Sequence, residues 1–192
     1  FLLKLTDHLG PLADPQEIIS EATHLVGQHF KADRAYYYEI DENGWATMSK
    51  GFSADGKSIP KKFPVSGFGE LLLEAMQKGR SFVIGNFAED DRFSREEKKT
   101  WKENGLSGGV AIPLVKEGKL IAALGLNNIN PRAWQEDEIK LLQEIAERTW
   151  ATLERAKIEK DLKENEERLL QAMEAGSQFG WEVDLETGKI KY

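Results

Sequence analysis

The polar and apolar positions along the chain first form a helical pattern after residue 13. Within ADPQEIISEATHLVGQHF, Asp14 stands at an expected N-cap, Pro15 takes the first helical position and Glu17 the third. This combination is typical of a helix start. The apolar residues that follow share one side of a helix, namely Ile18, Ile19, Ala22, Leu25, Val26 and Phe30. The pattern therefore predicts a helix with one buried face.

Two other segments each contain two strand-sized runs joined by a short turn, and they predict hairpins of antiparallel strands. In the first, DRAYYYEI and GWATMSKGF are joined by DENG, a turn rich in residues that tolerate positive φ. In the second, SGGVAIPLV and KLIAALGLNN are joined by KEGK. Antiparallel pairing is expected in both because such short turns cannot connect parallel strands.

Further elements are expected between the two hairpins. Ser66 is the expected cap of a helix in GFGELLLEAMQKG, and Gly79 can supply its left-handed C-terminal residue. SFVIG has the length and composition of a short strand. Ser94 and Glu97 have the spacing of a capping box, which predicts a helix running to Asn104.

The last long element is a helix, because neither Pro nor Gly occurs from Gln135 to Ala175. At 1.5 Å per residue it would span ~60 Å. The order of elements is helix, hairpin, helix, strand, helix, hairpin and long helix. Hairpins require antiparallel pairing, and the helices must cover the faces of the sheet. We expect an α+β fold with an antiparallel sheet of about five to six strands and helices on both faces.

Three segments together resemble a GAF domain, over about residues 12–158. They are ADRAYYYEIDENG, DDRFSREEKKTWKENGLSGGVAIPLVKEGKLIAALGLNN and RAWQEDEIKLLQEIAERTWATLERA. The resemblance implies a regulatory module of a signalling protein. It also implies that one sheet face packs on the terminal helices, while the other can enclose a small-molecule pocket beneath the middle helices.

The tail EERLLQAMEAGSQFGWEVDLETGKIKY resembles the first segment of a PAS domain. We therefore expect a GAF core at residues 1–134, a closing helix that continues as a signalling linker at 135–175, and a truncated PAS start at 176–192. This layout resembles that of bacterial multi-sensor histidine kinases, with diguanylate cyclases as the alternative. The chain is expected to be part of a longer protein, with its final hairpin poorly ordered or docked on a neighbouring molecule.

The composition narrows the classes of partner. A net charge of −7 argues against a nucleic-acid surface, which requires a basic face. No apolar run approaches the roughly 18 residues of a membrane span, so we expect no membrane insertion and a cytoplasmic location. The 192 residues include no cysteine, which excludes zinc–thiolate sites, a covalently attached tetrapyrrole and thiol catalysis.

Candidate ligand-binding residues follow from the resemblance together with side-chain chemistry. Tyr36 and Tyr38 share one face of a strand, and the matching face lines the cavity in ligand-binding GAF domains; the alternative is simple sheet packing. Phe68 is expected beside them. Asn128 suits either a ligand contact or a cap for the turn before Pro131. Asp91 lies in a loop near the expected pocket mouth, where a solvated turn residue is the alternative.

Catalytic and metal sites are not expected. His24 and His29 are five residues apart on a predicted helix, so they lie about 140° apart and do not share a face. No carboxylate pattern completes a site with them or with His8. No Ser-His-Asp, Walker or Rossmann arrangement occurs.

The long helix carries two apolar seams. The first comprises Ile139, Leu142, Ala146, Thr149, Leu153 and Ala156, and the second comprises Ile158, Leu162, Asn165, Leu169 and Ala172. The seams are out of phase, with a slip at residues 157–161. Alternating three- and four-residue steps predict a parallel coiled-coil homodimer. The alternative is that the first seam covers the domain's own sheet and the remainder is solvated.

Two functions fit these observations. In the first, a small-molecule sensor passes a change at its pocket along the helix to the next domain. In the second, the domain is a ligand-free dimerisation module, which bulky side chains filling the cavity would favour.

Overall fold

Six strands form one antiparallel sheet in the order β3–β2–β1–β6–β5–β4. The computed structural model describes residues 1–54, 56, 61–103, 105–177, 182–183 and 190–191. The strands are β1 (Arg34–Ile40), β2 (Trp45–Ser53), β3 (Lys62–Pro64), β4 (Phe82–Ile84), β5 (Gly108–Lys116) and β6 (Lys119–Asn128). Both predicted hairpins and the short strand between them are present, which confirms the α+β fold.

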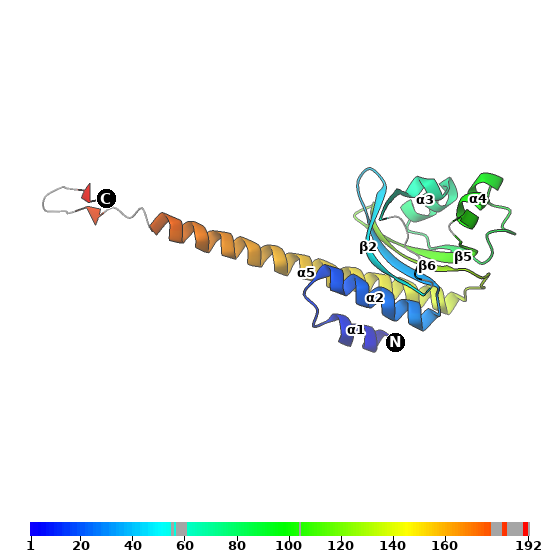
Figure 1. Ribbon diagram of the computed structural model, residues 1–192, viewed down its shortest axis with the longest axis horizontal. Coiled ribbons are helices and arrows are strands. Elements are labelled where there is room, and N and C mark those ends of the chain that lie inside the picture. Colours follow the sequence, from blue (N-terminus) through cyan, green and yellow to red (C-terminus); the bar gives the residue numbers. More distant parts are fainter. Residues whose placement is uncertain (55, 57–60, 104, 178–181, 184–189, 192) are drawn as a thin grey trace.

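Helices cover both faces of this sheet (Figure 1). One face carries α1 (Leu2–Leu9), α2 (Pro15–Phe30) and the first half of α5 (Glu136–Ser177). The other face carries the 3₁₀ turn η1 (Val65–Phe68), α3 (Glu70–Gln77) and α4 (Arg95–Glu103). The sheet thus separates two apolar cores, here called the helix-side core and the pocket-side core.

The ends of two helices agree with the sequence signals. The Asp14 side chain accepts a hydrogen bond from the Gln16 backbone N–H at 3.0 Å, and Pro15 is the first helical residue. Ser94 and Glu97 form the reciprocal capping box, with the Ser94 N–H donating to the Glu97 carboxylate at 2.7 Å and the Glu97 N–H to Ser94 Oγ at 3.2 Å. Gly79 has φ +67°, as expected after the end of α3.

The predicted cap at Ser66 is wrong. Ser66 lies inside η1, and α3 begins only at Glu70, after Gly69. Gly69 has φ 104° and ψ 150°, a conformation essentially restricted to glycine. This glycine turns the chain between the two helical segments, so that Ser66 cannot reach the first N–H groups of α3.

The strand β1 belongs to both cores because its side chains alternate. Tyr36 and Tyr38 are buried in the pocket-side core, whereas Tyr37 is buried in the helix-side core. The register with β2 shifts between Tyr36, opposite Gly51, and Tyr38, opposite Met48. This bulge places one extra residue in β2 without changing the alternation in β1.

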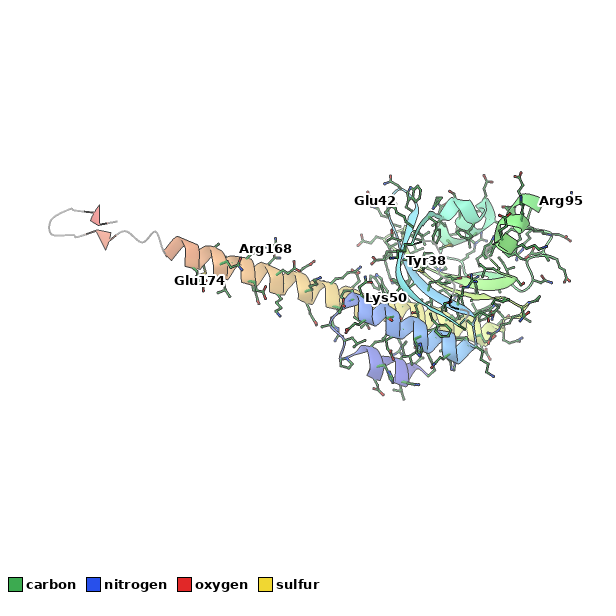
Figure 2. All side chains as sticks on the ribbon, in the orientation of Figure 1. Tyr38, Glu42, Lys50, Arg95, Arg168 and Glu174 are labelled. Atoms are coloured by element: carbon green, nitrogen blue, oxygen red, sulfur yellow. The ribbon has the colours of Figure 1, made fainter. Side chains whose placement is uncertain are left out.

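The helix α5 divides into a buried and an exposed half. In the first seam, Leu142, Ala146, Thr149, Leu153 and Ala156 are buried against the chain's own sheet and α2, and Ile139 is partly buried there. The hypothesis that this seam forms a coiled coil is therefore wrong for these residues, and the alternative of sheet cover is correct. The second half extends beyond the domain, where Arg168 and Glu174 lie (Figure 2). Within the described residues, no helix has the length and apolarity required to cross a membrane.

At the C-terminus, β7 (Glu182–Val183) pairs antiparallel with β8 (Ile190–Lys191). The predicted contacts of the final hairpin also depend on residues 178–181, 184–189 and 192, which lie outside the described residues.

Candidate functional site

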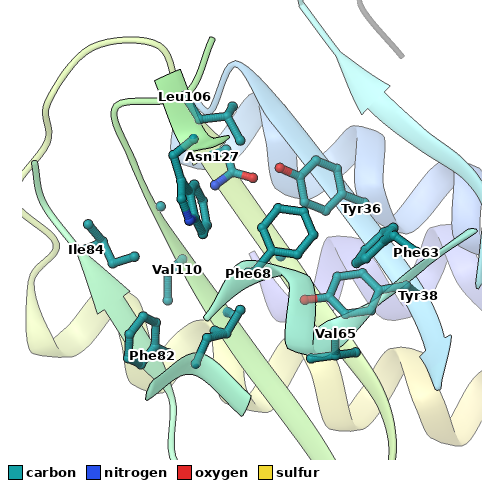
Figure 3. Close-up of a pocket in the computed structure, with 15 residues that line it drawn as sticks. Tyr36, Tyr38, Phe63, Val65, Phe68, Phe82, Ile84, Leu106, Val110 and Asn127 are labelled. Carbon is teal, nitrogen blue, oxygen red and sulfur yellow. The ribbon is translucent and has the colours of Figure 1, made fainter. Parts of the chain in front are cut away.

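A cavity of about 60 Å³ lies in the pocket-side core, between the sheet and the layer formed by η1, α3 and α4 (Figure 3). Its lining includes Tyr36 and Tyr38 from β1, Phe63 from β3, Phe68 from η1, Trp101 from α4 and Asn127 from β6. Of these residues, Phe63 and Trp101 did not stand out in the sequence. One available signal was Trp101, the only aromatic residue in the strongly polar helix REEKKTWKE.

Two glycines in the middle of strands form part of the cavity wall. Gly125 of β6 lies opposite Tyr36 of β1, and a Cβ built at Gly125 would come within 2.9 Å of two carbon atoms of the Tyr36 ring. A Cβ at Gly109 would come within 2.3 Å of the Asn127 amide nitrogen. Glycine in a strand interior often marks a close approach of this kind. These two positions leave the space in which Tyr36 and Asn127 face the cavity.

Aromatic rings surround the cavity in a continuous series. Ring centroids are 5.8 Å apart for Tyr38 and Phe63, 5.1 Å for Phe63 and Phe68, and 5.3 Å for Phe68 and Trp101. Trp101 in turn stacks on Phe87 at 4.1 Å. These rings occupy most of the space between sheet and helices, which explains the small volume that is left.

The polar groups of the cavity are uncharged. Burial raises the pKa of Tyr38 far above its usual value, so its phenol stays neutral at physiological pH. The buried Trp101 Nε1 has no hydrogen-bond partner among the described residues. Asn127 Nδ2 donates to the Gly108 carbonyl at 3.4 Å. None of the described lining residues carries a charged side chain. This environment suits a neutral guest, since an unpaired ion would lose its hydration without compensation.

The amide at the cavity belongs to Asn127 and not to Asn128. Asn128 is absent from the described lining; its Nδ2 instead donates to the Lys31 carbonyl at 3.5 Å, at the end of α2. Adjacent residues in a strand point to opposite faces. The proposed ligand contact of Asn128 is therefore corrected to its neighbour.

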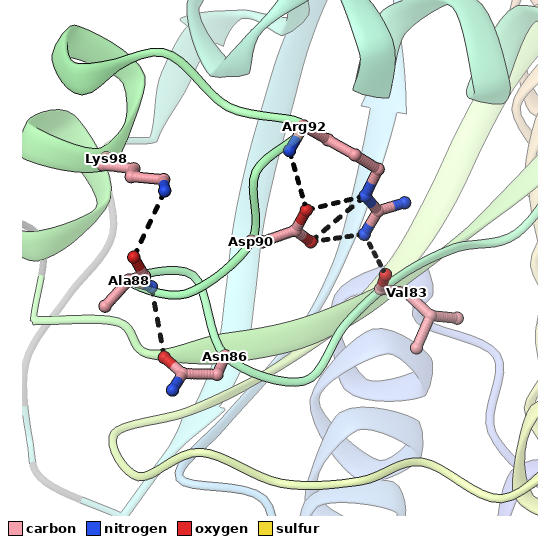
Figure 4. Close-up of polar contacts among 6 residues, drawn as sticks. All are labelled: Val83, Asn86, Ala88, Asp90, Arg92 and Lys98. Carbon is pink, nitrogen blue, oxygen red and sulfur yellow. Dashed lines mark hydrogen bonds and ion pairs between the residues drawn. The ribbon is translucent and has the colours of Figure 1, made fainter.

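The acidic loop places Asp90, not Asp91, in a defined contact (Figure 4). Asp91 is exposed and does not line the cavity. The Asp90 carboxylate accepts hydrogen bonds from the Arg92 backbone and guanidinium, and Arg92 Nη2 also donates to the Val83 carbonyl at 3.0 Å. These hydrogen bonds from Arg92 hold the pKa of Asp90 below its usual value. The contacts tie the loop to β4 beside the cavity.

The histidines take part in separate contacts. His8 Nδ1 lies 2.7 Å from the Glu21 carboxylate, His24 packs edge-on against Phe52, and His29 stacks on Phe1. In the part of the chain that the structure describes, no group of three or more His, Asp or Glu side chains is arranged to hold a metal ion.

The strand β1 also contacts the long helix directly. Burial, followed by the nearby carboxylates of Glu39, Glu154 and Glu147, raises the pKa of Tyr37. The Glu39 carboxylate pairs with Lys157 of α5. Beyond this point the second seam is exposed, since Ile158, Leu162 and Leu169 keep 65%, 58% and 62% of their surface. Asn165 of the same seam is exposed as well.

Residues 14–153 match the family model described as GAF domain. No curated protein matches the chain. Many solved structures share its fold, including the three that follow. The blue-light absorbing form of the Thermosynechococcus elongatus PixJ GAF domain has 21% identity and a TM-score of 0.66, with 79% of this chain and 92% of that chain covered. The phycocyanobilin-bound GAF domain from a cyanobacterial phytochrome has 16% identity and a TM-score of 0.71, with 82% and 94% covered. Free methionine-R-sulfoxide reductase from Neisseria meningitidis, in complex with its substrate, has 14% identity and a TM-score of 0.65, with 81% and 87% covered.

Proposed function

The chain belongs to the GAF domain family, and from this premise we propose that it is a sensory module that binds a small neutral molecule in the cavity and signals through α5. One observation carries the proposal. The strand β1 presents Tyr36 and Tyr38 to the cavity, and it presents Tyr37 and Glu39 to α5. A guest that moves the first pair also moves the second, because all four residues share one short segment of backbone.

The small-molecule part of the proposal draws support from two sources. The cavity combines aromatic walls with a few uncharged polar groups, a composition typical of ligand sites. In addition, PixJ and the cyanobacterial phytochrome are light-absorbing or bilin-bound GAF proteins. Since this chain has no cysteine, its guest would be held without a thioether bond. The neutral lining favours a guest that is neutral too.

The output part concerns the exposed half of α5. We assign its second seam to a parallel homodimer, in which Leu162, Asn165 and Leu169 of two copies meet. A helix of this length with an exposed apolar stripe would gain stability from such a partner. The parent protein in this proposal is a cytoplasmic sensor histidine kinase with a PAS domain after the helix, or a diguanylate cyclase with the same layout.

A ligand-free dimerisation module is the second candidate, and the small volume of the cavity favours it. Ligand pockets usually measure about 300–1,000 Å³, several times the 60 Å³ found here. In such a module the aromatic rings of the pocket-side core would serve to fill the core, with no space kept for a ligand.

Filling the cavity separates the two candidates. Ala111 of β5 lines the cavity, so Ala111→Leu adds a permanent apolar guest. The sensor predicts altered hydrogen exchange in β1 and in α5 at residues 150–160, measured by mass spectrometry. Ala88→Leu, at an exposed loop position, is the control and should change neither segment. A response confined to the cavity walls would contradict the sensor and favour the dimerisation module.

A further inference from the structure

Phe68 holds an unusual position among the cavity residues. Its ring lies between Phe63 and Trp101, with edge-to-face contacts to both at 5.1 and 5.3 Å. It is only partly buried, whereas Tyr36, Tyr38 and Trp101 are buried. In Figure 3 the Phe68 ring lies over the space that Tyr36 and Tyr38 face. Phe68 therefore forms part of the solvent-facing wall of the cavity, together with the partly buried Phe63.

The backbone around Phe68 is built differently from the other walls. Tyr36 and Tyr38 lie in β1, which pairs with β2 on one side and β6 on the other. Phe68 lies in a single 3₁₀ turn between Gly67 and Gly69. A Cβ at Gly67 would meet only Pro64, at 3.6 Å, and Gly69 has φ +104°. The backbone on either side of Phe68 can rotate at these glycines, whereas the backbone at Tyr36 and Tyr38 is held by hydrogen bonds to β2 and β6.

The volume of the cavity then determines what it can hold. An engineered apolar cavity that binds benzene measures about 150 Å³. At about 60 Å³, the present cavity is too small for a ring while Phe68 is in place. If the Phe68 ring moves out, it leaves a space between Phe63 and Trp101 that is large enough for another six-membered ring. Trp101, whose buried Nε1 has no partner among the described residues, lines the same cavity.

We propose that Phe68 is a gate that occupies the ring site of the cavity and swings out to admit a neutral aromatic ligand, to which Trp101 Nε1 donates a hydrogen bond. The ring of the ligand replaces the Phe68 ring against Phe63 and Trp101. The acceptor of the ligand, a carbonyl or ether oxygen, satisfies the buried indole N–H, whose burial without a partner is unfavourable. This inference rests on the proposed small-molecule function, because it concerns the same cavity.

Acetophenone is a suitable probe, since it is a neutral ring with one carbonyl acceptor. Phe68→Ala is expected to bind it at least tenfold more tightly than the unchanged chain in calorimetric titration. Phe52→Ala is the control, because it removes the same ring from β2 on the helix-side core. Phe52→Ala should bind acetophenone with the same affinity as the unchanged chain. Equal affinity of the unchanged chain and Phe68→Ala would overturn the gate.

The donor is tested by a matched pair of probes. α-Methylstyrene has the shape of acetophenone but lacks the oxygen. In Phe68→Ala, acetophenone should bind several-fold more tightly than α-methylstyrene, and adding Trp101→Phe should abolish this preference while keeping an aromatic wall. A preference that survives Trp101→Phe would overturn the assigned role of Trp101.

Binding kinetics of the unchanged chain provide a test that requires no substitution. If Phe68 must leave first, the observed association rate of acetophenone with the unchanged chain reaches a plateau as its concentration rises. A rate that rises linearly throughout would overturn the gate. The binding experiments with acetophenone test the gate, whereas hydrogen exchange in Ala111→Leu tests the relay through α5. Either proposal can therefore fail while the other holds.

Discussion

Lys157 of α5 pairs with Glu39 of β1 at the point where the helix leaves the sheet. Glu39 follows Tyr38 directly in the sequence, so the ion pair joins the helix to the strand that lines the cavity. Lys157 also bonds Glu154 within α5, at 3.2 Å. Ala156 is the last buried residue before the exposed half of the helix. This pair is therefore the outermost side-chain tie between β1 and α5 among the described residues.

Lys157→Ala is expected to loosen this junction while hardly changing global stability. The two side chains keep 41% and 50% of their surface, and exposed pairs of this kind contribute about 0.2–1 kcal/mol. Amide exchange at residues 154–160 should become faster, as measured by mass spectrometry. Lys160→Ala, at an exposed position three residues further on, is the control. Unchanged exchange at 154–160 in Lys157→Ala would contradict a role for the pair in joining helix and strand.

Gly125→Ala is expected to destabilise the fold by about 1–3 kcal/mol, the usual effect of overpacking a core. The new Cβ would come within 2.9 Å of the Tyr36 ring, which has little room to move in the pocket-side core. Urea unfolding followed by circular dichroism measures the change. Gly67→Ala is the control, since its Cβ would lie 3.6 Å from the nearest atom. If Gly125→Ala left the free energy of unfolding unchanged, the Tyr36 ring would have to be free to shift.

The relation between Tyr36 and Gly125 also explains what the sequence could predict of the site. The period of two in YYY correctly separates Tyr36 and Tyr38 from Tyr37. It does not say which residue of β6 faces Tyr36, because the register between strands depends on the turns and on the whole sheet. Once Tyr36 is opposite Gly125, Asn127 faces the cavity and Asn128 does not. Loops have no regular period, so the sequence could not show which of Asp90 and Asp91 makes a defined contact.

The pair of Asp90 and Arg92 predicts a pH dependence. Because hydrogen bonds from Arg92 hold the pKa of folded Asp90 below its usual value, the pair stabilises the fold at neutral pH. This contribution is fully present above about pH 4, the ordinary value for aspartate, and is lost as the pH falls through the lower folded value. Asp90→Asn should cost about 1 kcal/mol at pH 7, and its difference from the unchanged chain should shrink below about pH 4.

Unfolding free energies between pH 2 and pH 7, from urea titrations, measure this difference. Asp91→Asn, which removes the neighbouring exposed carboxylate, is the control and should retain the pH dependence due to Asp90. A constant difference between Asp90→Asn and the unchanged chain across this range would exclude the pair as its source.

Ser94→Ala and Ser66→Ala should differ in their effect on stability. Ser94 caps α4 through its Oγ, and loss of such a cap costs about 0.5–2 kcal/mol. Ser66 was the expected cap of α3 but lies in η1, without a side-chain cap bond to that helix. Ser66→Ala should therefore stay within about 0.5 kcal/mol of the unchanged chain in thermal unfolding. Equal losses would indicate that Ser66 stabilises its helix in another way.

The two seams of α5 show a limit of pattern reasoning. Leu142 and Leu162 both belong to predicted apolar seams, but one is buried in the chain's own core and the other is 58% exposed. The spacing predicts an apolar stripe, not the surface that covers it. The change of phase near Lys157 was the informative signal, because one straight helix cannot direct both seams at the same sheet.

Charge beside the second seam predicts a salt-dependent homodimer. With Leu162 and Leu169 in the core of a parallel pair, Asp161 lies next to Glu166 of the other copy, and the like charges repel. Added salt should strengthen association by screening them. Glu166→Lys should strengthen it roughly tenfold at low salt, since each interface gains two attractive pairs. Sedimentation equilibrium measures both effects.

Glu167→Lys is the control for that experiment, because residue 167 lies on the outer side of the parallel pair. It makes the same change of charge without approaching the other copy. Equal effects of Glu166→Lys and Glu167→Lys would rule out the parallel arrangement of this seam.

The exposed half of α5 extends from the sheet as a straight rod, and the contact of Lys157 with Glu39 is its last attachment to β1 among the described residues. From there to Ser177 the helix rises about 30 Å at 1.5 Å per residue, so a tilt of about 5° moves its far end by roughly 2.5 Å. In the proposed relay, a small displacement of β1 by a guest is therefore enough to move the end of the helix. A stiff rod attached at one strand amplifies a small rotation of that strand into a shift comparable with half a helical turn.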